Sequence, residues 1–223
     1  MTDWDGDSPR LHANLNEVLD KLAAEAPRRR RFSVEHAREW QRRTMTGLTA
    51  PNAAYVGAFR GEPGLEDVEV IVGNANGVPA ADVAVNLAAF ERTLVSIIEQ
   101  LDARYPSADA LDTDGLEAVI DLAAWAHAEW VRIHPFANAN GRTARLWANA
   151  IFMRYGIEPM IRLRRRPAHG YGAAGAAAMR ADWQPTAAAF RRLLGDHYGT
   201  RRPLGSRAKK TKLPPRKAQT VAG

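Results

Sequence analysis

The 223-residue sequence contains no cysteine. Disulfide bonds, thiolate metal ligands and cysteine nucleophiles are therefore excluded, and core packing must stabilise the fold. The sequence also lacks any stretch close to the roughly 18 apolar residues that a membrane-spanning helix requires. Its acidic, polar residues 1–10 contain no apolar segment of a secretion signal. We therefore expect a cytoplasmic protein, although signal-independent export would leave the same pattern.

Acidic residues are absent from residues 200–223, which contain eight Lys and Arg residues and several prolines. These eight charges exceed the net charge of +6 of the whole chain, so residues 1–199 are slightly acidic. A segment with so little apolar content cannot offset the entropy cost of ordering, so we predict a disordered basic tail. A solvated extension without a specific partner is the simpler interpretation, and contact with nucleic acid or a membrane surface is the alternative.

The remaining composition, 46% apolar and 25% charged, is that of an ordinary soluble globular protein. A chain of this length accommodates one fully cored domain of ordinary size. We predict an N-terminal helical extension over residues 1–30, one domain over residues 31–199 and the tail over residues 200–223.

Apolar residues recur with a spacing near 3.6 residues in several long segments, as one face of a helix requires. The first such stripe runs from Leu11 to Leu22 and ends before Pro27. Further segments predict helices over residues 33–48, 80–104, 116–131, 142–155 and 173–194. The fold class that follows is all-α, or mainly helical.

One interval departs from the helical pattern. The β-prone runs Tyr55–Arg60 and Val68–Val72 are separated by a segment rich in Gly and Pro, which predicts a β-hairpin near residues 55–73. An isolated hairpin is marginally stable in water, so we expect this one to pack on the helices. Its exposed edge is a place where a peptide could add as a further strand.

Residues 133–145, Ile-His-Pro-Phe-Ala-Asn-Ala-Asn-Gly-Arg-Thr-Ala-Arg, combine the groups of an anion site. A helix that begins near Arg142 offers unpaired backbone N–H groups and the positive end of its dipole. Asn140 adds a donor amide, and Gly141 lets a ligand approach the backbone closely. Arg142 and Arg145 are spaced by three, so they lie on one helical face and supply two guanidinium groups.

His134 lies just upstream of these residues, and the unperturbed pKa of its side chain suits proton transfer near neutrality. A histidine beside a phosphate site indicates phosphoryl transfer. We interpret Phe136 as an apolar pin that packs the loop against the core. Asn-Ala-Asn-Gly also occurs at residues 74–77, where we interpret it as a turn. The prediction therefore depends on the combination of His134 with the two arginines.

His127 lies seven residues before His134, almost two helical turns, and could suggest a metal site. No second group of ligands accompanies this pair in the sequence. A histidine satisfied by packing on a helix is therefore the simpler interpretation.

The segment around His134 resembles the signature of the Fic (Fic/Doc) family, His-x-Phe-x-(Asp/Glu)-Gly-Asn-Gly-Arg-x-x-Arg. The resemblance covers roughly residues 31–195 and implies a helical Fic fold with a β-hairpin flap. It implies AMP transfer from ATP to a Ser, Thr or Tyr hydroxyl of a target protein bound along the flap. His134 would take the proton from that hydroxyl. Asn140, Gly141 and Arg142 would hold the triphosphate, with Arg145 reaching its γ-phosphate.

Two positions depart from the family pattern. Asn138 replaces the acidic residue that holds Mg²⁺ in the family, and Ala139 replaces a glycine. A carboxamide oxygen can ligate Mg²⁺ but adds no negative charge, so we expect the metal to be held weakly. An alanine at the position of Ala139 resembles the pattern of the Doc branch, which phosphorylates its target. Gly141, however, stands where that branch carries lysine.

We therefore expect AMP transfer rather than the alternatives of phosphorylation, UMP transfer and phosphocholine transfer. A catalytically weak Fic-like module that binds nucleotide or a partner is the alternative from another class, because Asn138 lacks the metal-binding charge. The family is also often restrained by a helix with the pattern Ser/Thr-x-x-x-Glu-Gly/Asn. No glutamate here is followed by Gly or Asn, so we expect a separate antitoxin-like inhibitor or no such control.

Overall fold

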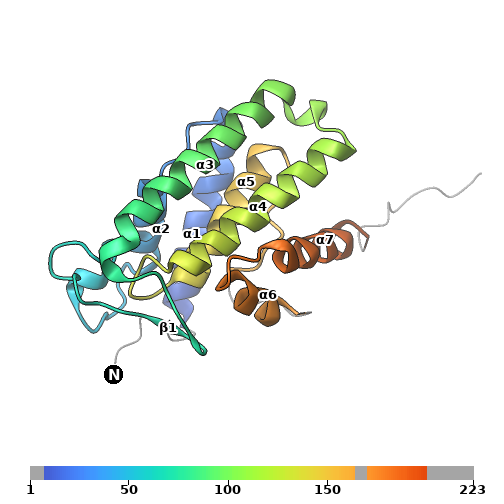
Figure 1. Ribbon diagram of the computed structural model, residues 1–223. Helices are drawn as coiled ribbons and strands as arrows, with labels where there is room; N and C mark the ends of the chain where they lie inside the picture. The colour runs from blue at the N-terminus through green and yellow to red at the C-terminus, as the bar shows by residue number, and fades with distance from the viewer. Residues whose placement is uncertain (1–7, 164–169, 200–223) are drawn as a thin grey trace, which may run out of the picture.

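The computed structural model describes residues 8–163 and 170–199 (Figure 1). This part of the chain is mainly helical, as the apolar periodicity predicts, and holds one small sheet. None of its helices is long and apolar enough to cross a membrane. The predicted basic tail lies outside the described residues. The helices are α1 (Pro9–Glu25), α2 (Val34–Thr44), α3 (Val83–Arg104), α4 (Thr113–Ile133), α5 (Asn140–Arg154), α6 (Tyr171–Ala178) and α7 (Gln184–Gly199).

Helix α5 is the centre of the core. All of its residues from Arg142 to Arg154 are buried, as expected of a helix enclosed on every side. It packs along α4, which in turn contacts α3, α6 and α7 (Figure 1). The rings of Phe90, Trp130 and Trp147, from α3, α4 and α5, meet with centroids 5.4–5.7 Å apart. This packing fixes the positions of α4 and α5 relative to each other.

Helix α1 packs on α2 and α5. Three residues of its predicted apolar stripe, Leu11, Leu15 and Val18, are buried. The side-chain amide of Asn14 donates to the carbonyl of Thr44, at the end of α2, at 3.1 Å. The residues before position 31 therefore contribute to the same core as the helices that follow.

Residues 173–194, predicted as one helix, form two. Helix α6 ends at Ala178, Ala181 has a φ of 61°, and α7 begins at Gln184. Pro185 explains the break, because proline lacks a backbone N–H and its ring clashes with the preceding turn inside a helix, whereas it is tolerated in a first turn. The alanine-rich composition hid this stop, since alanine favours helix at every position.

The hairpin lies further along the chain than predicted. Its strands, β1 (Ile71–Val72) and β2 (Ala75–Asn76), pair antiparallel. Of the two predicted strands, only Val68–Val72 overlaps with it. The tetrapeptide at residues 74–77, predicted as a turn, supplies the whole of β2. The flap is thus a short ribbon whose strands have two residues each.

Tyr55–Arg60 is predicted as a strand, but Tyr55 ends a 3₁₀ turn that begins at Ala53, and residues 56–60 form a loop, so that prediction is wrong. At Gly57, side chains rather than a second strand bind the main-chain groups of this loop. The Gly57 N–H donates to Oε1 of Gln41 at 2.6 Å, and the Gly57 carbonyl accepts from Arg38 at 3.0 Å. Because these buried groups already have partners, strand pairing is not required.

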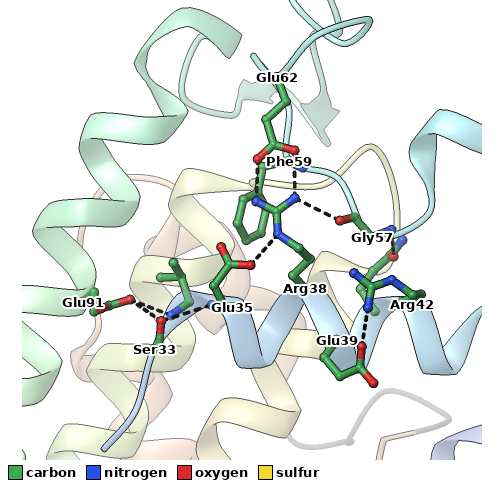
Figure 2. A network of polar contacts seen from close by, with 11 residues as sticks. Ser33, Glu35, Arg38, Glu39, Arg42, Gly57, Phe59, Glu62 and Glu91 are labelled. Carbon is green, nitrogen blue, oxygen red and sulfur yellow. Dashed lines mark hydrogen bonds and ion pairs between the residues drawn. The ribbon is translucent and has the colours of Figure 1, made fainter.

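Arg38 of α2 clamps the same loop (Figure 2). Its guanidinium donates to both carboxylate oxygens of Glu62, at 2.8 and 2.5 Å, and lies 4.2 Å from the centre of the Phe59 ring. Such two-pronged pairs of arginine and carboxylate are strong and directional. The hydrogen bond from Arg38 holds the pKa of Glu62 below its ordinary value. The loop is therefore fixed on α2, with Phe59 packed against Phe136.

His127 of α4 packs between the bundle and its last two helices. Its Nε2 is hydrogen bonded to the Tyr171 hydroxyl of α6, and its ring meets that of Phe190 of α7 edge to face. The ring is 2% exposed. Burial, with a smaller effect of nearby Arg145, lowers the pKa of His127 to about 3. The imidazole is therefore neutral in the folded protein near neutral pH.

This burial predicts a pH dependence of stability. Because the folded pKa of His127 lies below the ordinary value of 6.5, the unfolded chain binds the extra proton between these two pH values. The free energy of unfolding should therefore fall as pH drops through this window, by at most about 1.4 kcal/mol per pH unit for this group. Urea unfolding of His127→Gln should show a shallower pH dependence than the unchanged protein. Equal slopes would contradict a buried, neutral His127.

Candidate active site

Helix α4 ends at Ile133 and is capped by His134, whose backbone is left-handed with φ 54° and ψ 54°. This conformation costs a residue other than glycine about 1–3 kcal/mol and persists only where the surroundings impose it. The His134 N–H donates to the Trp130 carbonyl at 3.0 Å and closes the last turn of α4. The chain then enters the loop over residues 135–139, which leads directly to α5.

Hydrogen bonding sets the tautomer of the His134 imidazole. Its Nδ1 lies 2.9 Å from the carbonyl oxygen of Val131. A carbonyl oxygen only accepts, so Nδ1 carries the proton and Nε2 keeps a lone pair. Burial lowers the pKa of His134, and the charge of Arg60 lowers it further, against the opposing effect of the Val131 hydrogen bond. The ring is therefore neutral near neutral pH and can accept a proton at Nε2.

Asn140 braces the loop between α4 and α5. Its Oδ1 accepts from the Phe136 N–H at 2.8 Å, and its Nδ2 donates to the Phe136 carbonyl at 2.7 Å. The Phe136 ring is fully buried, 4.8 Å from the Phe59 ring centre to centre. One of the two amide N–H groups of Asn140 is thus used within the protein. The predicted contact with phosphate would use the second N–H group of the Asn140 amide.

Helix α5 begins at Asn140, two residues before the predicted start near Arg142. Ala139 precedes it with a left-handed φ of 73°, and its carbonyl accepts from the N–H groups of Arg142 and Thr143 at 3.0 and 2.9 Å. Within the described part of the chain, the backbone N–H groups of Asn140 and Gly141 have no hydrogen-bond partner. Unpaired amides at the positive end of a helix dipole form an anion site.

Both predicted arginines are buried at this helix start. Arg142 is 4% and Arg145 5% exposed. Nη2 of Arg145 donates to the Leu163 carbonyl at 2.8 Å. A methyl group added at Gly141 would lie 3.4 Å from Nη1 of Arg145, so this guanidinium lies against the backbone that carries the unpaired amides. Positive charge therefore gathers at the start of α5.

Asn138 does not complete a metal site by itself. Its Oδ1 accepts from the Ala139 N–H at 2.6 Å, which leaves one oxygen lone pair and no negative charge. In the described ranges, no group of three or more His, Asp or Glu side chains could hold a metal ion. Mg²⁺ prefers an octahedral set of oxygen ligands. Asn138 can supply one neutral oxygen to such a set.

Residues 31–152, just over half of the chain, match the sequence model of the Fic/DOC family. The chain belongs to the Fic/DOC family. The matched range includes α2, the flap, α4 and most of α5, together with the loop between α4 and α5 that carries the Fic signature.

Curated relatives carry the name protein adenylyltransferase Fic. The protein from Nematostella vectensis is 52% identical over 52 residues, which are 23% of this chain and 12% of the relative. The protein from Drosophila mojavensis is 36% identical over 93 residues, or 42% of this chain and 16% of the relative. The matches therefore span only a small part of the length of these relatives.

Solved structures share the fold. A Fic domain containing signaling protein from Bacteroides thetaiotaomicron aligns with a TM-score of 0.54 at 21% identity, covering 83% of this chain and 68% of that chain. Fic-1 from C. elegans aligns with a TM-score of 0.50 at 23% identity, covering 88% and 55%. The all-α Fic fold with a small hairpin, predicted from the sequence, is confirmed.

Two residues at the Fic site escaped the sequence analysis, Arg60 and Gly77. Arg60 donates to the carbonyls of Ile133 and His134 at 3.0 and 2.8 Å. A methyl group added at Gly77 would lie 3.0 Å from Cβ of His134 and 2.8 Å from Cγ2 of Val70. Gly77 follows β2 and, with Val70, forms the foot of the flap. The foot of the flap thus packs directly on His134. Neither residue carries a signal in the sequence, because both act through main chain and close approach.

The close contact at Gly77 predicts the effect of adding a methyl group there. Gly77→Ala should lower the free energy of unfolding by about 1–3 kcal/mol through overpacking. It should also shift the imidazole NMR signals of His134, because the added methyl presses on its Cβ. Gly172→Ala in α6 is a matched control, since nothing lies within 4 Å of the added methyl there. Unchanged His134 signals in Gly77→Ala would contradict the contact.

Proposed function

We propose that this Fic domain transfers AMP from ATP to a Ser, Thr or Tyr hydroxyl of another protein. The observation that carries the proposal is the pairing of two features across one short loop. A neutral histidine with a free lone pair at Nε2 ends α4, and unpaired amides with two buried arginines begin α5. The name of the relatives, protein adenylyltransferase Fic, supports the same reaction.

The reaction follows from these groups. The hydroxyl oxygen attacks the α-phosphorus of ATP while its proton passes to Nε2 of His134. The bond from the α-phosphorus to the oxygen bridging to the β-phosphate breaks, and pyrophosphate leaves. The amides of Asn140 and Gly141, with Arg142 and Arg145, stabilise the negative charge of the phosphates. Positioning and charge stabilisation supply most of what phosphoryl transfer requires.

The flap is proposed as the docking site of the target. Ile71 of β1 is 73% exposed, and a two-stranded ribbon leaves backbone groups free to pair with an added strand. Because the foot of the ribbon packs on His134, a segment paired along it would pass close to the base. A separate antitoxin-like inhibitor and a contact of the tail with nucleic acid remain predictions from the sequence.

Labelled ATP tests the proposal. The protein is incubated with cell lysate and ATP labelled at either the α- or the γ-phosphate. Label retained by protein only from the α position supports AMP transfer. Label only from the γ position would show phosphorylation instead, and no label from either would favour the binding module or another donor, such as UTP.

His134→Ala should reduce the rate of label transfer by about 10²–10⁴-fold, the usual contribution of general base catalysis. Affinity for ATP, measured by calorimetry, should change little, because the phosphate groups bind at α5. Transfer that survives at the original rate would show that another group takes the proton. A matched loss of ATP affinity would place the histidine in binding.

Asn138→Asp tests the effect of the carboxamide that replaces the acidic residue of the family pattern. The new carboxylate keeps an oxygen that accepts from the Ala139 N–H and adds the negative charge that Mg²⁺ favours. Affinity for Mg²⁺ in the presence of ATP should therefore increase, measured by titration of Mg²⁺ against bound nucleotide. Asn138→Ala, which removes the single side-chain oxygen, should bind Mg²⁺ no better than the unchanged protein. Equal Mg²⁺ affinity of all three proteins would show that residue 138 does not face the metal.

A further inference from the structure

Arg60 is a buried charge whose role the signature does not describe. It lies in the loop between α2 and the flap, and its side chain is fully buried. Its ion-pair partner is Glu69, whose side chain is 58% exposed, at 3.2 Å. A buried guanidinium is costly unless hydrogen bonds replace its water. The partners of Arg60 therefore indicate what the residue is for.

All five N–H groups of the guanidinium have an acceptor. Nε donates to the His134 carbonyl at 2.8 Å. Nη2 donates to the carbonyls of Val78 and Ile133, at 2.6 and 3.0 Å. Nη1 donates to the Val68 carbonyl at 3.1 Å and to Glu69. Four of the five acceptors are main-chain carbonyls.

These carbonyls come from three segments that are distant in sequence. Val68 and Val78 lie on the two legs of the hairpin, outside the pair formed by the Gly77 N–H and the Val70 carbonyl. Ile133 and His134 end α4. In Figure 1 the hairpin lies beside this end of α4. One side chain therefore ties both legs of the flap to the residue that carries the base.

The end of α4 needs such a partner. The last carbonyls of a helix have no partner within it and carry the negative end of its dipole, which favours a cation. The backbone N–H of Arg60 donates to the next carbonyl, that of Pro135, at 2.7 Å. Arg60 thus binds three consecutive carbonyls, from Ile133 to Pro135. These contacts hold His134 in its left-handed conformation.

We propose that Arg60 is a positioning residue that couples the position of the flap on the helices to the orientation of His134. Through it, a target segment held by the flap and the base that deprotonates it keep one geometry. The proposal rests on the proposed function for its catalytic consequence, whereas the coupling itself is a property of the fold.

Lysine cannot replace this residue. Its ammonium has three donors around one point and no planar fork, so it cannot reach carbonyls on three segments at once. Arg60→Lys therefore keeps the charge and loses the geometry. Arg60→Gln loses both.

Arg154 provides a matched control. It is also buried, 6% exposed, and donates to the carbonyls of Arg29 and Arg30, at 2.9 and 2.8 Å, and to Asp102. Arg154 is the last residue of α5, whereas the signature residues lie before this helix and in its first turns. Arg154→Lys should cost comparable stability without touching the flap or His134.

Amide hydrogen exchange tests the coupling without any catalysis. The His134 N–H, bonded to Trp130, reports on the end of α4, and the Gly77 N–H, bonded to Val70, reports on the flap. Both amides should exchange at least tenfold faster in Arg60→Lys, relative to the change in global stability, and neither should in Arg154→Lys. Loss of protection at only one of the two amides, or equal loss in the control, would overturn the proposal.

Label transfer from ATP tests the catalytic consequence. With saturating ATP, Arg60→Lys should lower the rate of transfer about 10²-fold, the usual result of a misplacement near 1 Å, while KM for ATP stays within about threefold because α5 is unchanged. Arg154→Lys should keep the rate. A rate in Arg60→Lys equal to that of the control would overturn the positioning role. No transfer by the unchanged protein would contradict the proposed function, while the exchange result still decides the coupling.

Discussion

The contact between the Arg60 guanidinium and the carbonyl end of α4 is the constraint on which the site depends. A helix that stops abruptly leaves its last carbonyls without partners, and here the stop is at a histidine in a left-handed conformation. A buried cation with five donors satisfies those carbonyls and both legs of the flap together. Removal of either partner would leave the other buried and unpaired, so the two features stabilise each other.

The loop between α4 and α5 is short and bounded by two left-handed residues, His134 and Ala139. Its conformational cost is offset by contacts on both sides. Phe136 packs into the core, and the Asn140 amide pairs twice with the Phe136 backbone. Because the aromatic cluster around Trp130 and Trp147 fixes α4 against α5, His134 and the start of α5 are held by the core itself.

Apolar periodicity predicted helices with one buried stripe, such as α1, whereas the alanine-rich residues 173–194 were predicted as one helix and form two. The spacing of Arg142 and Arg145 correctly predicted that both lie on one helix, although α5 begins two residues before the predicted start near Arg142. The hairpin could not be placed, because its strands have only two residues each and the loop before it is held by Arg38 and Gln41 of α2. Arg60 was missed because its acceptors are main-chain carbonyls, which every residue has.

Helix α5 and the hairpin differ in how easily their residues can change. Helix α5 cannot shift without disturbing the whole interior, because each of its residues from Arg142 onward is buried. The ribbon at β1 and β2 is shallow and exposed at Ile71, so changes there cost little packing. Substitutions in the ribbon should therefore be tolerated more readily during evolution than substitutions in α5.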